Sequence, residues 1–517
     1  RKLLSFTDNR QDAALQAGHF NDFISLGLVR SGLYRALEQA GDAGIRHEEL
    51  PQRVFEALDL PIRLYAQNPE VLYGQREATQ RALRRVLGYS IYRDLARGWR
   101  LTSPNLEQCG LLTIEYRDLD KLCAETAAWT ELHPLLGAAE PALRRTICEV
   151  LLNYLRRELA IYIEFLDPDT QEQIRLDSNQ LLIDPWRLGD TERLVHSHFA
   201  VPSSSSRGRD GGGDDGGRFV YVSPRGGFGQ YLRRNTVLGA FGKLSVDETT
   251  SVIEALFTAL TKKLGILRET SVGRRGGATR GYQLAAAEMI WHRGKGESAA
   301  HDPIRVPQKP DHGLRPNSFF IDFYRADTRD LTMLQAHEHT AQVRADERER
   351  RETSFRKAEL PLLFCSPTME LGVDIAELNV VNMRNVPPTP ANYAQRSGRA
   401  GRSGQPAFVF TYCTSSSPHD HYFFRHPERM VAGEVSPPRL DLANEDLLRA
   451  HVHAIWLAES GLRLGSSLAD LLDVSGDNPT LDPQTQVAEA LHEPAARARA
   501  LGRAQSALGP ALAELFP

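Results

Sequence analysis

Two separated parts of this chain alternate short apolar runs with helical segments, and this pattern constrains the fold more than any other feature. Residues 2–7 form a short apolar run, Thr7-Asp8-Asn9 is a helix-start signal, and small or apolar residues then recur at helical spacing from Ala13 to Ile24. The same pattern returns near residue 330. Strands that alternate with helices at this spacing predict a parallel α/β sheet.

The second part of the pattern supplies most of the expected sheet. We predict strands at residues 331–336, Pro361–Cys365, Val373–Met383 and Ala407–Cys413. A charged helix is expected at Ala345–Lys357, and another helix begins at Asn392–Arg396. The predicted fold class is therefore α/β, with a parallel-sheet lobe that is interrupted by a large, mainly helical insert.

The insert has a different character from the two ends of the chain. A strongly amphipathic stretch runs from Leu143 to Leu166, and Ser203–Gly217 is a Ser/Gly/Asp-rich stretch that cannot bury a core and reads as a flexible linker. Beyond it, Asp247–Leu264 is expected to be a helix. Two strands, Gly265–Val272 and Gly281–Trp291, then enclose a Gly/Arg tip, and this order of elements predicts a winged helix.

These patterns divide the chain into six expected segments. They are the first part of the parallel-sheet lobe at 1–30, a helical insert at 31–202, a linker at 203–217, a winged helix at 218–300, the remainder of the lobe at 315–435 and a helical C-terminal region at 436–517. Because the chain opens without Met on a segment that reads as a buried strand, we expect the polypeptide to continue upstream of Arg1.

Composition limits the class of protein. The 517 residues are too many for one ordinary domain, and 41% hydrophobic and 25% charged residues are typical of a soluble globular protein. There is neither an apolar run of about 18 residues nor a signal peptide, so we expect a cytoplasmic protein with no membrane contact. The net charge of −4 excludes no partner, because a DNA-binding protein need be basic only where DNA touches it.

Cysteine and histidine spacing gives no indication of a metal site. The five cysteines are scattered, without the CxxC spacing of a zinc site or the pattern of a disulfide framework, and we expect thiols that mostly pack in the core. His419-Asp420-His421 with His426 is better explained as a set of loop histidines than as a metal cluster. His451 and His453, near Trp456 in a helix expected from Glu445 to Ser460, are interpreted as residues of core or interdomain packing rather than as metal ligands.

The strongest chemical signal is the segment Gln395–Arg402. Its three arginines, Arg396, Arg399 and Arg402, are spaced by three beside small residues, so their guanidinium groups can project from a helix start into a neighbouring cleft. A planar, permanently charged fork suits a phosphate that is undergoing transfer. The alternative is a basic helix start with ordinary surface arginines.

Two further segments lie upstream of it in the chain. In Ser366–Ile375 an apolar strand runs into a loop with Thr368 and then into Gly-Val-Asp-Ile; an ordinary strand–turn–helix unit is the alternative. The opening strand with Phe6–Asp12 is a weak signal by itself.

In their order, the three segments resemble motifs IV, V and VI of superfamily 2 helicases. The resemblance rests on SPTMELGVDI and NYAQRSGRAGR, covers residues 1–30 and about 315–435, and looks closest to large bacterial DEAD/DEAH-box-type helicases, the MrfA-like DNA-repair group and helicases of phage-defence systems. It implies that the lobe is the second RecA-like lobe of such a motor.

The resemblance also implies roles for individual residues. Arg399 and Arg402 would be arginine fingers that reach ATP on the first lobe, Gln395 would contact its terminal phosphate region, and Arg396 would link to the acidic motif of that lobe. Gly372 and Asp374 would lie at the nucleotide edge of the cleft between the lobes. The residues that would face nucleic acid are Thr368, Thr7, His339 and Thr340.

The sequence departs from the family by lacking the parts that grip ATP. There is no GxxxxGK[ST] phosphate loop, and no apolar strand ends in a DExH or DEAD quartet. The resemblance therefore implies that ATP and Mg²⁺ are bound mainly by a missing first lobe. We expect this chain by itself not to hydrolyse ATP.

The expected wing is the best candidate for duplex contact. From Thr261 to Gly296 there are eight Lys and Arg residues against Glu269 and Glu288, and a Gly/Arg tip with Arg274, Arg275 and Arg280 can follow phosphates without reading bases. A solvated hairpin or a protein-docking wing is the alternative.

The leading hypothesis is the C-terminal motor half of an ATP-dependent DNA helicase or translocase. Its expected partners are single-stranded or partly duplex DNA, the upstream RecA-like lobe of the same polypeptide, and proteins of a repair or defence system. Two alternatives stay open, an RNA helicase and a nucleic-acid-binding scaffold whose motor is inactive.

Overall fold

The computed structural model divides into two compact units, Arg1–Val431 and Ala432–Pro517, and each is described by itself. The described residues are 2–7, 9–96, 103–189, 192–203, 219–274, 277–308, 315–326, 329–366, 378–401, 406–434, 444–475 and 479–515.

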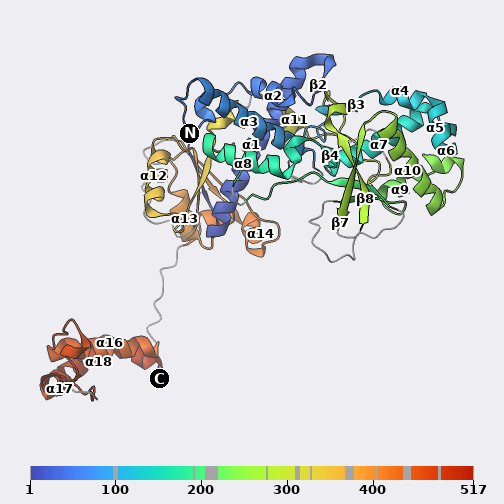
Figure 1. Cartoon of the computed structure of the whole chain (residues 1–517). Coiled ribbons are helices and arrows are strands. Elements are labelled where there is room, and N and C mark those ends of the chain that lie inside the picture. Colours follow the sequence, from blue (N-terminus) through green and yellow to red (C-terminus); the bar gives the residue numbers. More distant parts are fainter. Residues whose placement is uncertain are drawn as a thin grey trace. The chain divides into compact units, whose positions relative to one another are not determined.

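A five-stranded parallel sheet organises one part of the first unit (Figure 1). Its strands, in spatial order, are β10 (Ala336–His339), β11 (Leu362–Cys365), β1 (Leu3–Phe6), β12 (Val380–Met383) and β13 (Phe408–Thr411). The strand nearest the N-terminus therefore lies at the centre of the sheet, where Leu4 pairs with Leu363 on one side and Val381 on the other. This arrangement confirms the predicted α/β class and its parallel sheet.

Helices cover both faces of this sheet. On one face, side chains of β1, β11 and β12 pack against Phe355 of α12 (Ala345–Arg356) and Tyr393 of α13 (Pro390–Ser397). On the other face, Ala13 and Ala17 of α1 (Arg10–Ala40) pack against Ala336 and Phe364. Because successive side chains of a strand point to opposite faces, the apolar runs of this sheet supply both layers.

Helix α1 joins the sheet to the insert. Asn9 caps its N-terminus, with the side-chain oxygen accepting the backbone N–H of Asp12 at 2.9 Å. The helix has 31 residues, and its second half, including Leu28 and Leu33, lies in the core of the insert. The division that we placed after residue 30 falls inside this continuous helix.

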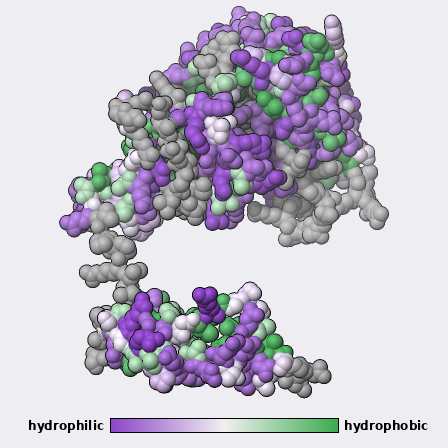
Figure 2. Space-filling view, turned by 90° about the vertical axis from the view of Figure 1, so that its left-hand side faces the viewer, coloured by the Kyte–Doolittle hydropathy of each residue, from purple (hydrophilic) through white to green (hydrophobic). Residues whose placement is uncertain are grey.

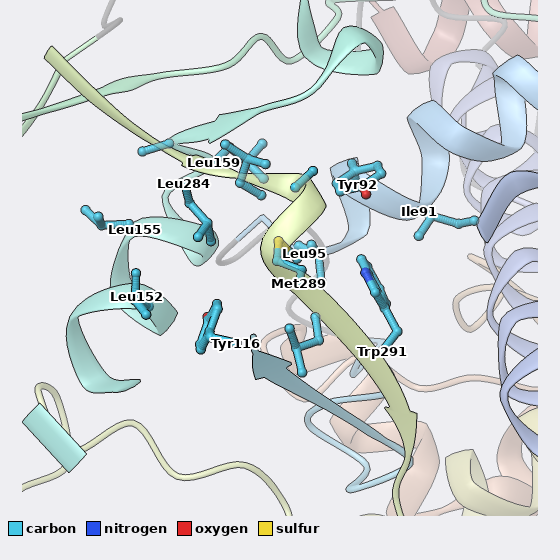
Figure 3. Close-up of a cluster of buried hydrophobic side chains, with 14 of the residues drawn as sticks. Ile91, Tyr92, Leu95, Tyr116, Leu152, Leu155, Leu159, Leu284, Met289 and Trp291 are labelled. Atoms are coloured by element: carbon cyan, nitrogen blue, oxygen red, sulfur yellow. The ribbon is translucent and has the colours of Figure 1, made fainter. Parts of the chain in front are cut away.

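The insert contains two small sheets around one apolar core. One sheet has the order β2 (Ile45–Arg46), β9 (Met289–Arg293), β3 (Leu112–Tyr116). The other has the order β4 (Ile161–Tyr162), β8 (Gly277–Ala285), β5 (Phe199–Pro202), β6 (Phe219–Val222), with β7 (Leu267–Arg274) also paired to β8. Figure 3 shows part of the core, where Leu284 lies near Leu155, Met289 lies near Leu95, and Trp291 packs against Tyr92.

Helices make up most of the remaining insert. The α-helices are α2 (Leu50–Leu58), α3 (Tyr73–Asp94), α4 (Leu119–Ala124), α5 (Thr126–Leu132), α6 (Pro134–Ala138), α7 (Pro141–Arg157), α8 (Pro168–Leu181), α9 (Gly227–Leu232), α10 (Val246–Lys262) and α11 (Ser318–Arg325). Short 3₁₀ turns are η1 (Gly41–Ala43), η2 (Ile62–Leu64), η3 (Glu164–Leu166), η4 (Leu238–Phe241), η5 (Ala286–Glu288) and η6 (Arg329–Met333).

The expected winged-helix domain is not confirmed. Helix α10 and the antiparallel hairpin of β7 and β8 are present, but β8 also pairs with β4 and β5, and β9 pairs with β2 and β3. These strands therefore share sheets and core with residues 45–202. The expected return strand is also interrupted, because η5 separates β8 from β9. Residues 204–217 of the expected linker lie outside the described residues.

Two local predictions differ from the structure. The strand predicted at residues 331–336 is wrong, because η6 occupies Arg329–Met333 and β10 begins only at Ala336. The side chain of Asn21 bonds both backbone groups of Ala336 at 2.9 Å and thereby fixes where the edge strand starts. The amphipathic stretch expected to Leu166 ends as a helix at Arg157, since Leu159 has a positive φ of 54°.

The other helical predictions agree closely with the observed elements. Helix α12 matches the predicted charged helix to within one residue, and the first strand and the strands at β11 and β13 lie within their predicted ranges. Residues 373–377 of the strand predicted at Val373–Met383 lie outside the described residues, and β12 forms its last part. The first unit ends with α14 (Pro418–Arg425) and α15 (Pro427–Val431).

The regular elements described in the second unit are helices, and Leu472 and Pro483 also form an isolated antiparallel bridge. The unit contains α16 (Glu445–Ser460), η9 (Leu468–Asp470), α17 (Thr485–His492) and α18 (Pro494–Leu515). Arg503 of α18 pairs with Glu459 of α16 at 2.8 Å, and the Trp456 indole donates to the Leu491 carbonyl at 3.1 Å. His451 and His453 are exposed on this unit, so they do not pack in its core, and interdomain packing of these histidines stays a prediction.

The polarity of the surface, the composition of the helices and the state of the thiols complete the description. On the face of the first unit drawn in Figure 2, hydrophilic residues cover most of the described surface, with small hydrophobic groups between them. Among the described helices, none has the length and apolar composition needed to cross a membrane. All five cysteines are free, and four of them are buried, as expected for core packing.

Candidate functional site

Because the five strands are parallel, all their carboxyl ends lie at one edge of the sheet and all their amino ends at the opposite edge. Chain segments that follow β1, β10, β11 and β12 leave the sheet at its carboxyl edge. In open α/β sheets, ligands bind outside this edge, because loops and helix N-termini converge there. Of the predicted nucleic-acid residues, Thr7, His339 and Thr340 lie at this edge, directly at or after the ends of β1 and β10.

The side chain of Thr7 is used inside the protein. It is fully buried, and its hydroxyl lies 2.9 Å from the carbonyl of Asn9 and 3.2 Å from that of Cys365. Its backbone N–H also donates to the Cys365 carbonyl at 3.0 Å. Thr7 therefore ties the end of β1 to the end of β11, and this burial weighs against direct contact of its hydroxyl with nucleic acid.

His339 and Thr340 are also fully buried. Burial, with Arg348 and Arg351 nearby, lowers the pKa of His339 to about 4, so the imidazole is neutral at pH 7. Its Nε2 lies 3.2 Å from a carboxylate oxygen of Glu352, which the neutral ring contacts without forming an ion pair. Both side chains therefore support the edge from inside the protein.

Helix α13 positions part of the predicted nucleotide-facing segment. Thr389 caps it by accepting the backbone N–H of Asn392 at 3.3 Å. Gln395 is exposed at its surface, whereas Arg396 is 2% exposed and its guanidinium lies 5.5 Å from the centroid of the Phe6 ring. The helix therefore anchors itself on the sheet through Arg396 and presents Gln395 outward.

Arg399 lies beyond the end of α13 and is partly exposed. The next residue, Ala400, forms a bridge with Leu378, and Gly401 donates its N–H to the Leu378 carbonyl at 3.1 Å. Since Leu378 precedes β12, Arg399 is held near the amino end of that strand, away from Thr7 and Thr340. The structure thus places Arg399 toward the opposite end of the strands from Thr7 and Thr340.

Several predicted site residues lie outside the described residues. They are Thr368, Gly372, Asp374, Arg402 and Arg275. Arg274 ends strand β7, and only its backbone is described.

The β7–β8 hairpin carries Arg280 at its surface. This side chain is 77% exposed and pairs with Glu269 across the hairpin at 3.4 Å. Other cations of the predicted basic set have partners elsewhere in the insert, such as Lys263 with Glu131 and Arg293 with Glu38. Arg280 is therefore the described residue of the tip that is best placed for contact with a phosphate backbone.

Sequence reasoning missed a group of side chains after β12. The Arg384 guanidinium lies 4.6 Å from the centroid of the Tyr412 ring, and Asn385 accepts the Thr414 hydroxyl at 3.0 Å. The buried Asp420 carboxylate accepts the backbone N–H of Thr414 at 2.7 Å. Position directly after a parallel strand is the signal that could have identified Arg384 and Asn385.

His419 of α14 and His426, which directly follows this helix, have ordinary protein contacts. His419 lies 3.1 Å from the Pro387 carbonyl through Nε2, and His426 lies 3.7 Å from Glu428. In the part of the chain that the structure describes, no cluster of three or more His, Cys, Asp or Glu residues is arranged to hold a metal ion.

Comparison with known proteins adds a family match in this part of the chain. Residues 321–404 match the family model described as the helicase conserved C-terminal domain. A curated relative, the Druantia protein DruE of Escherichia coli (strain UMEA 4076-1), is 39% identical over 138 residues. That alignment covers 24% of this chain and 8% of DruE, so the chain spans a small part of this relative.

Two solved structures are similar over short parts. The DUF1998 helicase MrfA bound to DNA is 21% identical, covers 34% of this chain and 23% of its own, and has a TM-score of 0.24. Saccharomyces cerevisiae Dbp5 bound to RNA and ADP BeF3 is 16% identical, covers 23% of this chain and 30% of its own, and has a TM-score of 0.18. These TM-scores are too low to support a conclusion about this chain.

Proposed function

We propose that this chain, which carries the C-terminal lobe of a superfamily 2 helicase, is the second motor half of an ATP-dependent DNA helicase or translocase. The observation that carries the proposal is the helicase C-terminal match over residues 321–404, which includes β10 to β12, α13 with Gln395 exposed on it, and the partly exposed Arg399 just beyond that helix. A motor lobe needs such groups at its surface, because the phosphate that they act on is held by another lobe.

In this proposal ATP and Mg²⁺ are held mainly by a first RecA-like lobe of the same polypeptide. The sequence of this chain has no phosphate loop and no DExx quartet, so its own contribution is to the transferring phosphate. Arg399 and Arg402 act as arginine fingers, and Gln395 contacts the terminal phosphate region.

The remaining predicted residues of this site hold helix α13 on the sheet or lie beside the nucleotide. Buried Arg396 holds α13 on the sheet by packing on Phe6, and we propose that it also links to the acidic motif of the first lobe. Gly372 and Asp374 form the nucleotide edge. Closure of the two lobes brings these groups to ATP, and opening releases them.

The nucleic acid in this proposal is single-stranded or partly duplex DNA. Thr368 faces the strand, and Thr7, His339 and Thr340, which are buried as whole residues, position the edge that the strand meets. The hairpin tip with Arg274, Arg275 and Arg280 follows the duplex backbone. Proteins of a DNA-repair or phage-defence system are the proposed partners.

The first experiment measures DNA-stimulated ATP hydrolysis by the full-length helicase. An arginine finger contributes about 10³–10⁵ in kcat, so Arg399→Ala and Arg402→Ala should each lower kcat by at least about 10²-fold. Arg350→Ala is the matched control, because Arg350 is an exposed arginine of α12 that pairs with Glu347 at 2.8 Å. Near wild-type turnover in both finger variants would refute the assignment.

The second experiment separates DNA from RNA. Strand displacement is measured on partial duplexes with a DNA or an RNA tracking strand, at several salt concentrations. The proposal predicts displacement on the DNA strand, and that Arg280→Ala lowers DNA affinity and the salt dependence of binding. Preference for the RNA strand would make the motor an RNA helicase, and hydrolysis without displacement on either strand would support translocation alone.

A further inference from the structure

A large cavity lies in the insert, away from the helicase-type edge. It has a volume of about 1110 Å³ and is open to solvent. One wall comes from β4, η3 and the start of α8, and the other comes from β7 and β8, which lie beside β4 in Figure 1. We call it the insert cavity. Its size exceeds the range of about 300–1,000 Å³ that is usual for small-molecule sites.

One wall of the insert cavity presents aromatic rings. Tyr162 of β4 is 50% exposed, and Phe199 at the start of β5 also lines the cavity. The guanidinium of Arg268 lies 3.7 Å from the centroid of the Tyr162 ring. This contact shows that the ring face accepts a cation, since the negative face of an aromatic ring attracts guanidinium and ammonium groups.

The floor presents a hydrogen-bond acceptor. Gln283 is 6% exposed, and its amide nitrogen donates to the Ser197 hydroxyl at 2.5 Å and to the His198 carbonyl at 3.1 Å. Among the described residues, no hydrogen bond to its amide oxygen is found. A buried amide in this position offers its oxygen to whatever enters the cavity.

The rim presents carboxylates. Glu48, Glu164 and Asp167 all line the cavity. Asp167 caps α8 by accepting the backbone N–H and hydroxyl of Thr170, whereas the side-chain carboxylates of Glu48 and Glu164 form no ion pair or hydrogen bond within the described residues. The only lysine or arginine among the lining residues is Arg268, which lies on Tyr162.

We propose that the insert cavity binds a segment of a partner protein by holding an arginine or lysine side chain of that segment. The Gln283 amide oxygen and the carboxylates of the rim are acceptors, and a guanidinium or ammonium group offers only donors. The aromatic faces receive the cation, Gln283 and the carboxylates accept its N–H groups, and the apolar walls accommodate neighbouring side chains. Nucleic acid fits this lining poorly, because its phosphates would meet three carboxylates.

The test is direct binding to the full chain without ATP, so its outcome does not depend on motor activity. The probe is a short fluorescein-labelled peptide of alternating arginine and leucine, and anisotropy gives its Kd. Glu164→Gln and Glu48→Gln should each weaken binding about tenfold, which corresponds to about 1.4 kcal/mol. Glu349→Gln, at an exposed glutamate of α12 far along the chain, is the matched control and should leave the Kd unchanged.

Arg268→Ala distinguishes the two classes of ligand by the sign of its effect. Removal of this cation frees the Tyr162 ring and removes repulsion, so peptide affinity should rise several-fold, whereas a nucleic-acid site would lose affinity. Thermal melting of each variant confirms that it folds, and Glu164→Lys provides a second, stronger charge change. An unchanged Kd in the Glu164 variants, weaker peptide binding by Arg268→Ala, or displacement of the peptide by an oligothymidine would each overturn the proposal.

Discussion

Replacement of Arg30 by Ala should destabilise the first unit strongly, because this arginine joins three helices inside the insert core. Its guanidinium pairs with Asp94 of α3 through two bonds of 2.9 and 2.6 Å. It also donates to the Ser103 hydroxyl at 2.7 Å and to the Tyr324 hydroxyl of α11 at 2.7 Å. The side chain of Arg30 is 2% exposed and that of Asp94 is 12% exposed, so the pair is shielded from water.

The size of the effect follows from this burial. Removal of one member of a buried, hydrogen-bonded ion pair leaves the other charge without compensation, at a cost of about 3–5 kcal/mol. The pair of Arg117 and Glu288 has the same two-bond geometry, at 2.8 and 2.5 Å, but its arginine is 44% exposed. Water screens that pair, so Arg117→Ala should cost no more than about 1 kcal/mol.

Urea unfolding, followed by tryptophan fluorescence, measures both free energies of unfolding under the same conditions. A double variant, Arg30→Met with Asp94→Leu, should recover much of the loss, because an apolar pair no longer leaves a buried charge. Equal losses of unfolding free energy in Arg30→Ala and Arg117→Ala would refute the reasoning, because burial of the ion pair would then have no effect beyond its hydrogen-bond geometry.

Two further predictions concern the histidine at the sheet edge and the glycines of the insert. Since the pKa of His339 is lowered to about 4 in the folded state, the unfolded chain binds more protons between about pH 6.5 and pH 4, and the free energy of unfolding should fall as the pH decreases through this window. His339→Phe should flatten this decrease in urea titrations, and an unchanged pH slope would contradict the assigned cause. Gly110→Ala should lower the melting temperature more than Gly265→Ala. Both glycines have a positive φ, of 67° and 69°, which strains any other residue. Only at Gly110 would the added Cβ also meet a backbone oxygen, that of Ser298 at 2.2 Å. Equal melting temperatures for the two glycine variants would show that the close approach has no effect.

Periodicity was sufficient to predict the parallel sheet and much of its helical cover. The apolar run at residues 2–7 and the later strands share one pattern, and the structure places them in one sheet. The insert was harder, because its sheets pair residues that are distant in the chain, such as Ile45 with Trp291. A hairpin after a helix has the same local pattern whether it stands alone as a wing or joins a larger sheet.

For single side chains of the site, the sequence pattern likewise does not tell whether the group faces a ligand or the protein interior. A threonine after a strand reads identically whether its hydroxyl faces a ligand or a neighbouring carbonyl, and the structure shows the second for Thr7. His339 followed the pattern of a strand-end ligand residue but is buried and neutral. The insert cavity could not be read from the sequence at all, because Glu48, Tyr162 and Gln283 meet only through non-local strand pairing.

The central claim is that Arg399 acts on the transferring phosphate of ATP held by another lobe. Its most direct test is Arg399→Lys in the full-length helicase, with ATP affinity and single-turnover hydrolysis measured separately on the same preparation. Lysine keeps the charge but lacks the planar fork, so the account predicts hydrolysis that is at least about 10²-fold slower while the Kd for ATP changes by no more than a few-fold. Hydrolysis at the wild-type rate, or a loss of ATP binding that accounts for the whole defect, would contradict it.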